Sequence, residues 1–262
     1  MIKNLIIGGN GFLGSELNKF LIQNGESSSV FGKKNSNEDI RYCKIPAYNF
    51  DIIYFLAWDF GSSKYISCEN KYSEQIKNNL EILTNTIPQL IDSDKKVIFI
   101  SSFAADNTDF PYGITKKIAE MWMSQHKFIS LRLGNIYGKI KKSDKKSDVI
   151  SDFINQAINN KKIVMDTDGE EKRQFIHYSD AVRIIKQSSE LEIKKIYDTN
   201  SNFQWISILD IAKIISSYTG AEIVKGSKKG IYREFQTKDT IKNFEAKVSI
   251  ENGILELLKN EQ

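Results

Sequence analysis

The chain has 262 residues, of which 40% are hydrophobic and 27% are charged. This composition excludes an intrinsically disordered chain and suffices for one large α/β unit, alone or with a smaller lobe. The net charge of +4 comes from 37 basic and 33 acidic residues, and the lysines are scattered among the acidic residues. Because nucleic-acid binding needs a concentrated basic face, this pattern argues against that class of partner.

Neither a membrane protein nor a metalloprotein is expected. No apolar run approaches the roughly 20 residues that a bilayer span needs, and the first residues lead directly into a strand and a glycine-rich motif, so no signal peptide is expected. Cys43 and Cys68 lack the spacing of metal ligands and are predicted to be free thiols in a reducing compartment. With His126 and His177 as the two histidines, no zinc site is predicted. The sequence therefore predicts a cytoplasmic protein.

In chain order, short apolar runs alternate with runs of helical periodicity throughout the first half of the sequence. The first apolar run, residues 3–7, ends at Gly8 and is typical of a buried parallel strand. Strands are predicted over 3–7, 28–31, 51–57, 96–101 and 128–133. Helices are predicted between them over 15–23, 72–91 and 112–125. This alternation predicts an α/β fold with a doubly wound, parallel, Rossmann-type sheet and helices on both of its faces.

Past Gly138 the alternation is less regular. A lysine-rich loop leads into helices and strands that are predicted over 149–158, 163–166, 179–188, 195–199, 207–218 and 250–258. We interpret residues 1–138 as a dinucleotide-binding Rossmann domain and 139–262 as a smaller α/β C-terminal lobe that binds the substrate. Part of about 174–200 is expected to return to the sheet.

Three polar side chains of this second half are interpreted as structural. Ser207 is expected to be the N-cap of the helix that follows it. Asp180 is expected to cap a helix that begins near Ala181, where a carboxylate is favourable. His177 has apolar and aromatic neighbours in the sequence and is expected to pack rather than to catalyse.

Residues 8–14, GGNGFLG, stand between the first predicted strand and the first predicted helix. Glycines at positions 8, 11 and 14 allow a sharp turn, bring backbone N–H groups against a pyrophosphate and let the helix pack closely on the strand. The helix N-terminus adds the positive end of its dipole. The motif therefore predicts a dinucleotide-binding site.

The identity of the dinucleotide depends on the end of the second strand. An acidic residue there accepts hydrogen bonds from the ribose of NAD. In its place the sequence has Gly32, Lys33 and Lys34, and the next carboxylate is that of Glu38. Because ammonium groups attract a 2′-phosphate, NADP is favoured, with NAD and ordinary surface lysines as the alternative.

Tyr112 and Lys116 form the pattern Tyr-x-x-x-Lys, and Ser101 and Ser102 end the preceding strand. In a helix, this spacing puts the tyrosine and the lysine on one face. A Lys116 ammonium group is expected to lower the pKa of the Tyr112 phenol, which could then exchange protons near neutral pH. A serine hydroxyl at the end of the strand can hold a carbonyl or alcohol oxygen.

Together with the glycine motif, these segments resemble the extended short-chain dehydrogenases/reductases of the nucleotide-sugar epimerase/dehydratase type. The resemblance runs nearly end to end, through GGNGFLG, FDIIYFLAW, KNNLEIL, VIFISS, PYGITK, LRLGNIYG and GEEKRQFIHYSDAV. It implies a nicotinamide cofactor, a nucleotide-sugar substrate and a homodimer built from the fourth helix and the Tyr-Lys helix. The apolar residues expected on that dimer face, or alternatively over the sheet, are Ile76, Leu80, Leu83, Ile87, Ile118, Met121 and Trp122.

The motifs and the resemblance together name the candidate site residues. The implied catalytic residues are Ser102 (with Ser101 as the alternative hydroxyl), Tyr112 and Lys116. The cofactor-binding residues are Gly8, Asn10, Gly11, Phe12, Leu13, Gly14, Lys33, Lys34, Leu56, Ala57, Asn79, Tyr112, Lys116 and Leu133. The substrate-binding residues are Ser102, Asn135, Arg173 and Arg233. Trp58, next to Ala57, is expected either to line the nicotinamide pocket or to fill the core.

Departures from the family pattern narrow the predicted reaction. Phe103 and Ala104 follow Ser102, where sugar dehydratases of the family have an acid–base Asp-Glu pair. Neither Cys43 nor Cys68 is placed beside the serines, as a GDP-fucose synthase-like double epimerase would require. The sequence therefore predicts an NADP(H)-dependent reductase of a nucleotide-linked 4-keto(-6-deoxy) sugar, in nucleotide-sugar or surface polysaccharide biosynthesis. An NAD-dependent nucleotide-sugar 4-epimerase is one alternative, and a non-catalytic NADP(H) or nucleotide-sugar sensor is an alternative of another class.

Overall fold

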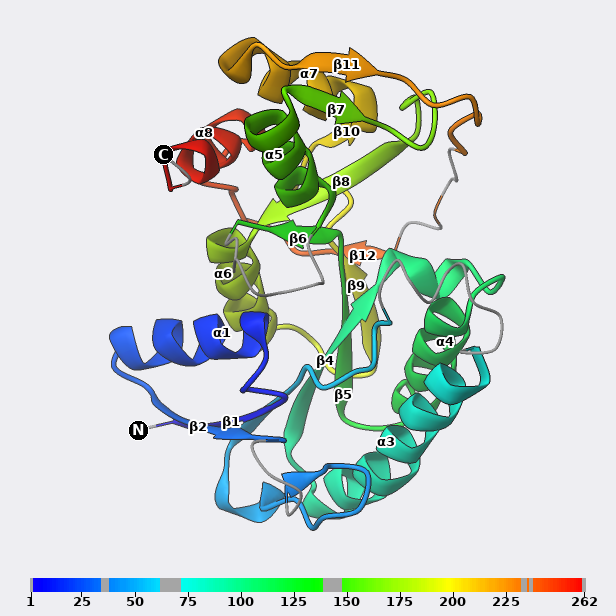
Figure 1. Cartoon of the computed structure of the whole chain (residues 1–262). Helices are drawn as coiled ribbons and strands as arrows, with labels where there is room; N and C mark the ends of the chain where they lie inside the picture. Colours follow the sequence, from blue (N-terminus) through cyan, green and yellow to red (C-terminus); the bar gives the residue numbers. More distant parts are fainter. Residues whose placement is uncertain are drawn as a thin grey trace. The chain divides into compact units, whose positions relative to one another are not determined.

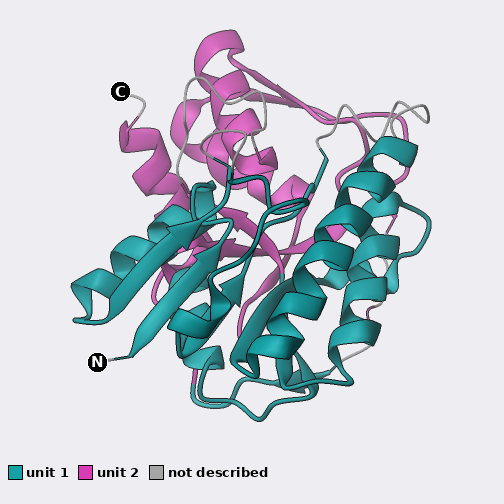
Figure 2. Ribbon diagram, turned by 90° about the horizontal axis from the view of Figure 1, so that it is seen from below, with its two compact units in different colours: residues 1–133, 181–199, 236–243 teal, residues 134–180, 200–235, 244–262 magenta. Residues whose placement is uncertain are grey.

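A computed structural model describes residues 2–33, 38–61, 72–138, 148–231, 235 and 238–260 of the chain. They form two compact units, which Figure 2 colours separately. The first unit comprises residues 1–133, 181–199 and 236–243, and the second comprises 134–180, 200–235 and 244–262. The division of the chain into domains at residue 138 stays a prediction.

The first unit contains a seven-stranded sheet whose neighbouring strands are all parallel. The strand order is β12-β9-β5-β4-β3-β1-β2. The strands are β1 (Lys3–Ile7), β2 (Ser27–Phe31), β3 (Ile52–Phe55), β4 (Lys96–Ser102), β5 (Phe128–Leu133), β9 (Lys195–Asp198) and β12 (Asp239–Thr240). The predicted α/β fold with a parallel Rossmann-type sheet is confirmed.

Helices cover both faces of this sheet. They are α1 (Phe12–Gln23), α3 (Tyr72–Ser93), α4 (Pro111–Met123) and α6 (Tyr178–Ser188), with the short 3-10 helices η2 (Ala47–Asn49) and η4 (Phe103–Asp106). On one face, α3 and α4 pack against apolar side chains that include Leu5, Ile53 and Phe99. Figure 1 shows α1 and α6 on the opposite face. Because both faces are covered, β5 is buried along its whole length.

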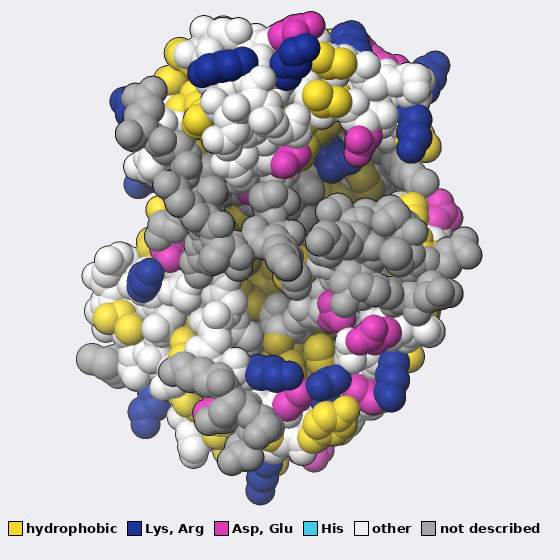
Figure 3. Space-filling model, viewed as in Figure 1, with side chains coloured by type: hydrophobic (Ala, Val, Ile, Leu, Met, Phe, Trp, Pro, Cys, Tyr) yellow, Lys and Arg dark blue, Asp and Glu magenta, His cyan; other side chains and the backbone are white. Residues whose placement is uncertain are grey.

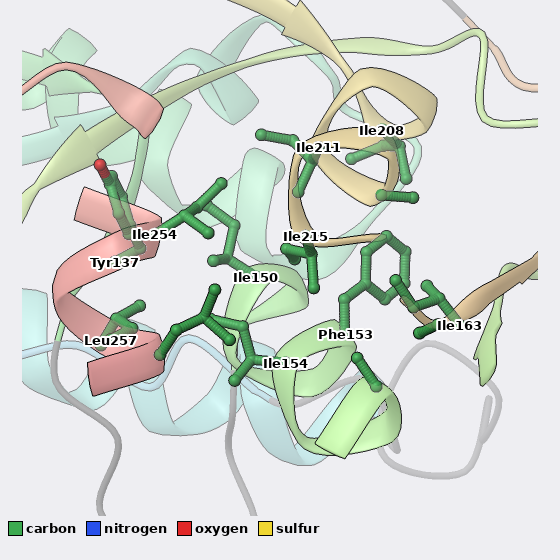
Figure 4. Packing of buried hydrophobic residues seen from close by; sticks show 14 of the residues in the cluster. Tyr137, Ile150, Phe153, Ile154, Ile163, Ile208, Ile211, Ile215, Ile254 and Leu257 are labelled. Carbon is green, nitrogen blue, oxygen red and sulfur yellow. The ribbon is translucent and has the colours of Figure 1, made fainter. Parts of the chain in front are cut away.

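The second unit has a core of its own, part of which Figure 4 shows. Its helices are α5 (Val149–Asn160), α7 (Ile208–Thr219) and α8 (Ile250–Asn260). Its strands form a three-stranded sheet of order β10-β8-β6 and a two-stranded sheet of β11 and β7. The strands are β6 (Asn135–Tyr137), β7 (Lys162–Val164), β8 (Lys172–His177), β10 (Trp205–Ser207) and β11 (Glu222–Val224). Ile154, Ile211 and Ile254, one from each helix, are buried together in this core.

Two helix starts test the predicted caps. Ser207 is the N-cap of α7, as predicted, and its Oγ accepts a hydrogen bond from the Asp210 N–H at 3.0 Å. The predicted cap at Asp180 is wrong, because α6 begins at Tyr178 and Asp180 lies buried in its first turn. The Asp180 carboxylate instead accepts hydrogen bonds from the N–H groups of Lys247 and Val248, both at 3.0 Å. A contact with a loop far along the chain therefore determines the role of this carboxylate.

The described residues include neither a helix that could span a membrane nor a cluster of side chains that could hold a metal ion. Within the described ranges, none of the helices combines the length and the apolar character that crossing a membrane requires. The same residues include no group of three or more His, Cys, Asp or Glu side chains that could hold a metal ion. Lys and Arg side chains are spread among acidic and apolar ones on the face in Figure 3. Cys43 is a half-buried free thiol, and Cys68 lies outside the described residues.

Candidate active site

The glycine-rich turn lies between β1 and α1, where the order of the parallel strands reverses between β1 and β3. Open α/β sheets bind ligands outside the carboxyl ends of their strands at such a point. Gly8 has a φ of +89°, and its N–H donates to the Phe31 carbonyl at 2.7 Å. A Cβ atom at Gly14 would lie 2.5 Å from the Gly8 carbonyl oxygen, and one at Gly8 would lie 2.6 Å from the Ala57 nitrogen. The turn therefore closes in this form only with glycine at both positions.

The start of α1 fits the phosphates of a dinucleotide. Gly11 is the N-cap and provides no side chain that could satisfy the N–H groups of the first turn. Such N–H groups, with the positive end of the helix dipole, bind phosphate oxygens. Phe12 and Leu13 in this turn are half-buried. The exposed Asn10 donates through Nδ2 to the Gly32 carbonyl at 3.1 Å, which ties the turn to the end of β2.

Leu56, Ala57 and Leu133 lie at the carboxyl edge of the sheet. The N–H groups of Leu56 and Ala57 both donate to the Ile7 carbonyl, at 2.8 and 3.0 Å, and so hold the chain after β3 against the glycine-rich turn. Leu133 ends β5 and is in register with Ser102 at the end of β4. The ends of four neighbouring strands thus bring the candidate cofactor-binding and catalytic residues to one edge.

Lys33 follows β2, and its side chain is 70% exposed, with Nζ 3.7 Å from Oδ2 of Asp39. Both carboxylate oxygens of Asp39 accept hydrogen bonds from the Arg41 guanidinium, at 2.9 and 2.7 Å. These hydrogen bonds lower the pKa of Asp39 to about 2. A charged carboxylate therefore lies beside the lysine after β2. The sequence reasoning missed it, although the closeness of Asp39 and Arg41 in sequence was a signal; Lys34 lies outside the described residues.

The hydroxyls of Ser101 and Ser102 have different partners. Ser101 is buried, and its Oγ donates to Oε1 of Glu120 at 2.6 Å. Ser102 is half-buried, its Oγ accepts a hydrogen bond from the Ala104 N–H at 3.2 Å, and its side chain also hydrogen-bonds with that of Tyr112. Successive side chains of a strand point to opposite faces, which separates the two hydroxyls. Ser102 is the serine beside the Tyr112 phenol.

Tyr112 and Lys116 stand one turn apart on α4. Lys116 is buried, and its Nζ donates to the Ile100 carbonyl at 2.6 Å and lies 5.7 Å from the centre of the Tyr112 ring. Burial lowers the pKa of Lys116 well below its ordinary value, although Glu120 acts to raise it. Burial raises the pKa of Tyr112 to about 12, although the hydrogen bond with Ser102 acts to lower it. The expected lowering of the Tyr112 pKa is wrong for this structure, because desolvation outweighs the hydrogen bond with Ser102.

Asn79 is fully buried on α3 and joins two neighbouring segments. Its Oδ1 accepts a hydrogen bond from the Asp59 N–H at 2.8 Å, and its Nδ2 donates to the Asp59 carbonyl at 2.9 Å and to Oγ1 of Thr115 at 3.2 Å. Gln75 on the same helix donates to the Asp59 carbonyl at 3.0 Å. Asn79 therefore holds the chain after β3 next to the helix that carries the Tyr-Lys pair.

Arg132 on β5 is fully buried and binds two carboxylates. Its Nε and Nη2 donate to Glu120 at 2.7 and 2.8 Å, and its Nη1 and Nη2 donate to Asp106 at 2.7 and 3.0 Å. Burial lowers the pKa of Arg132, but the hydrogen bonds with Glu120 and Asp106 raise it overall. Asp106 is the last residue of η4, and η4 directly follows Ser102. The network therefore joins β5, η4 and α4. The sequence reasoning missed this network, although a lone arginine in the apolar strand FISLRL was a signal.

Two candidate substrate-binding residues lie on neighbouring strands of the second unit. Asn135 on β6 and Arg173 on β8 are both exposed. The Nδ2 of Asn135 donates to the Gln174 carbonyl at 3.2 Å. Both side chains are therefore accessible to a ligand. Arg233, the third residue of this set, lies outside the described residues.

His177 at the end of β8 is buried among aromatic rings. Its ring centre lies 5.4 Å from that of Tyr137 and 4.6 Å from that of Tyr178, and its Nδ1 lies 2.7 Å from Oγ of Ser179. Burial lowers the pKa of His177, which favours the neutral ring. These contacts agree with the packing role expected from its neighbours in sequence.

Known proteins with the same fold cover almost the whole chain. The UDP-glucose 4-epimerase of Thermotoga maritima has a TM-score of 0.75 and 20% identity, over 100% of both chains. The ADP-L-glycero-D-manno-heptose-6-epimerase of Helicobacter pylori has a TM-score of 0.75 and 18% identity, over 99% of this chain and 96% of the other. TunA, an NAD dependent NDP-hexosamine 5,6-dehydratase of tunicamycin biosynthesis, has a TM-score of 0.75 and 17% identity, over 98% and 96%. No curated protein matches the chain significantly in sequence.

The family match covers most of the chain. Residues 4–199 match the model of the NAD dependent epimerase/dehydratase family, and this range includes the glycine-rich turn, Ser102, Tyr112 and Lys116. At the low identities above, the solved structures show the fold. The chain belongs to the NAD dependent epimerase/dehydratase family, which is a family of enzymes.

Proposed function

We propose that the protein is a reductase that converts the keto group of a nucleotide-linked 4-keto or 4-keto-6-deoxy sugar into a hydroxyl, in nucleotide-sugar or surface polysaccharide biosynthesis. The observation that carries the proposal is the Ser102–Tyr112 pair, in which burial keeps the phenol protonated, with a pKa of about 12, beside a serine hydroxyl. A protonated phenol is the form that gives a proton to a carbonyl oxygen. Phe103 and Ala104, after Ser102, supply no acid or base for dehydration.

Each side chain has one task in this mechanism. The Ser102 hydroxyl donates a hydrogen bond to the carbonyl oxygen and polarises the carbonyl group. The Tyr112 hydroxyl gives its proton to the same oxygen, so that the carbonyl becomes an alcohol. A charged Lys116 stabilises the phenolate that remains. The glycine-rich turn would hold a nicotinamide dinucleotide, which would supply the hydride that the carbonyl carbon receives.

The ligand contacts follow from exposed charges and amides. NADP is the proposed cofactor, because the exposed Lys33 after β2 can meet a 2′-phosphate, with Lys34 as its neighbour in sequence. Arg173 and Asn135 are the proposed contacts to the substrate, since a guanidinium group binds phosphate with two parallel hydrogen bonds. Arg233 completes this set on the basis of sequence.

The charge beside Lys33 favours a second candidate, an NAD-dependent nucleotide-sugar 4-epimerase. The Asp39 carboxylate lies 3.7 Å from Nζ of Lys33. A carboxylate after the second strand accepts hydrogen bonds from the ribose of NAD and opposes a 2′-phosphate. Among the similar structures, TunA is NAD dependent and the Thermotoga maritima enzyme is a UDP-glucose 4-epimerase. In an epimerase, Tyr112 would have to start as the phenolate, accept a proton from the sugar hydroxyl in the first step and return it in the second.

A cofactor and product assay distinguishes the two candidates. With a 4-keto-6-deoxy nucleotide sugar, the reductase is expected to consume NADPH in proportion to the alcohol that mass spectrometry detects, and to use NADH more slowly. An epimerase would instead interconvert two hexose epimers with no net change in nicotinamide absorbance. That second outcome, in the absence of keto-sugar reduction, would overturn the reductase proposal.

We also propose that the enzyme is a homodimer formed through α3 and α4. Of the apolar residues expected there, Leu83 and Ile87 are buried in the core, whereas Ile118 and Met121 are 38% and 63% exposed on α4. Met121→Asp is expected to lower the molar mass in sedimentation equilibrium from that of a dimer to that of a monomer. The control Ile22→Asp, at an exposed site on α1, is expected to stay dimeric. A wild-type protein of monomeric mass would contradict the proposal.

A further inference from the structure

Trp58 follows β3 closely and contacts the candidate catalytic lysine. The Lys116 Nζ lies 4.1 Å from the centre of the Trp58 ring and 4.4 Å from the centre of the Phe99 ring. The two ring centres are 5.4 Å apart, with the planes tilted by 58°. The same Nζ donates to the Ile100 carbonyl at 2.6 Å. We call the two rings and this carbonyl the Lys116 seat.

Neighbouring residues hold the indole in the seat. Its Nε1 is buried and has no hydrogen-bond partner within the described part of the chain, so a hydrogen bond from the indole does not set its orientation there. The next residue, Asp59, is tied through its backbone to Asn79 and Gln75 of α3. Phe99 is itself buried in the core between the sheet and α3 and α4. Backbone hydrogen bonds at Asp59 and packing against Phe99 therefore keep the indole beside Lys116.

We propose that Trp58 is a positioning residue whose indole face, with that of Phe99, holds the Lys116 ammonium group for its action on the Tyr112 phenol. The inference rests on the proposed function, in which Lys116 acts through Tyr112. An aromatic face attracts a cation most strongly when both are desolvated, and Lys116 is buried.

The carboxylate near the Lys116 seat favours the ammonium form of Lys116, as the aromatic faces do. Glu120, one turn further along α4, favours the charged form of Lys116. The β4 side of the seat, Phe99 and Ile100, carries no ionisable group, and neither does the indole of Trp58. Desolvation opposes these effects, because it disfavours the ammonium form. Because the indole face favours the ammonium form against this desolvation, its loss is expected to lower the pKa of Lys116 further.

Trp58→Leu, which removes the ring face, and Trp58→Phe, which keeps a smaller one, test the proposal in the full-length enzyme. Trp58→Leu is expected to lower kcat about tenfold, equivalent to about 1.4 kcal/mol, with little change in KM for the nucleotide sugar. The alkaline limb of kcat against pH is expected to move to lower pH. Trp58→Phe is expected to keep kcat and the alkaline limb close to their wild-type values.

Phe55→Leu is the matched control. Phe55 packs on Phe99 with the ring centres 5.5 Å apart, and it is one of the fully buried aromatic residues of the same core. This substitution is expected to lower the melting temperature while leaving the pH profile of kcat unchanged. A Trp58→Leu variant with the wild-type kcat and pH profile would overturn the proposal. If Trp58→Leu does not fold, the same comparison is made with Trp58→Phe, for which a smaller shift in the same direction is expected.

A second readout needs no turnover. In protein with ¹³C-labelled lysine, the Lys116 methylene signals, identified by Lys116→Arg, are expected at ring-current-shifted positions. They are expected to move toward ordinary lysine positions in Trp58→Leu and to stay in place in Phe55→Leu. Unchanged signals in Trp58→Leu would refute the Lys116 seat. If the wild type reduces no keto sugar but its Lys116 signals depend on Trp58, the proposed function fails and the seat stands.

Discussion

Replacement of Tyr112 by phenylalanine is expected to lower kcat for keto-sugar reduction by about 10²–10⁴-fold. The substitution removes the hydroxyl that gives the proton, and it leaves the ring, Ser102 and Lys116 in place. The wild type is expected to keep its proton donor throughout the neutral pH range, because the pKa of Tyr112 is about 12. Steady-state consumption of NADPH measures the effect, and dinucleotide binding, measured separately, is expected to persist in the variant.

Tyr218→Phe is the matched control for this experiment. Tyr218 is an exposed residue of α7, in the other unit, and its hydroxyl donates to Oε1 of Glu251 at 2.6 Å. Loss of this hydroxyl is expected to leave kcat unchanged. Full turnover by Tyr112→Phe would show that the assigned proton donor is wrong. A wild type that binds both ligands but turns over neither a keto sugar nor an epimer pair would support the sensor alternative.

Replacement of Arg132 by methionine is expected to lower the free energy of unfolding by about 3–5 kcal/mol. Methionine fills part of the space of the arginine but carries no charge. The fully buried Glu120 then loses its cationic partner, and Asp106 loses two hydrogen bonds. A buried charge without a partner is more costly than the pair is stabilising. Urea denaturation measures the loss through the midpoint at constant slope.

An exposed ion pair provides the control for Arg132→Met. Lys127 and Asp94 are 2.7 Å apart, but their side chains are 53% and 73% exposed. Because water screens such pairs, Lys127→Met is expected to change stability far less. The double variant Arg132→Met/Glu120→Gln is expected to be more stable than Arg132→Met alone, since it removes the unpaired charge. Equal losses for Arg132→Met and Lys127→Met would contradict the importance of the buried network.

The sequence by itself determined the alternation of strands and helices in the first half of the chain and the place of the glycine-rich turn, but it did not predict strands β6, β8, β10, β11 and β12. The strand predicted over 3–7 is β1 (Lys3–Ile7), and the helix predicted over 15–23 is α1, which starts earlier, at Phe12. These features can be predicted from the sequence because periodicity, capping and turn glycines are patterns among residues close in sequence. The glycine at position 8 was predicted from its place in the motif, and the structure adds the reason that no side chain fits there: its φ is positive and it lies close to Ala57, which is far along the chain.

Only the tertiary structure decided the environments of the side chains. Ser101 has its partner Glu120 19 residues away, and Arg132 reaches Asp106 over 26 residues, so no local pattern assigns these contacts. The same holds for the Tyr112 pKa, which the sequence predicted to be lowered and which burial raises to about 12. A local pattern can predict a helix face, but the sign of a pKa shift depends on how many distant atoms exclude water from the group.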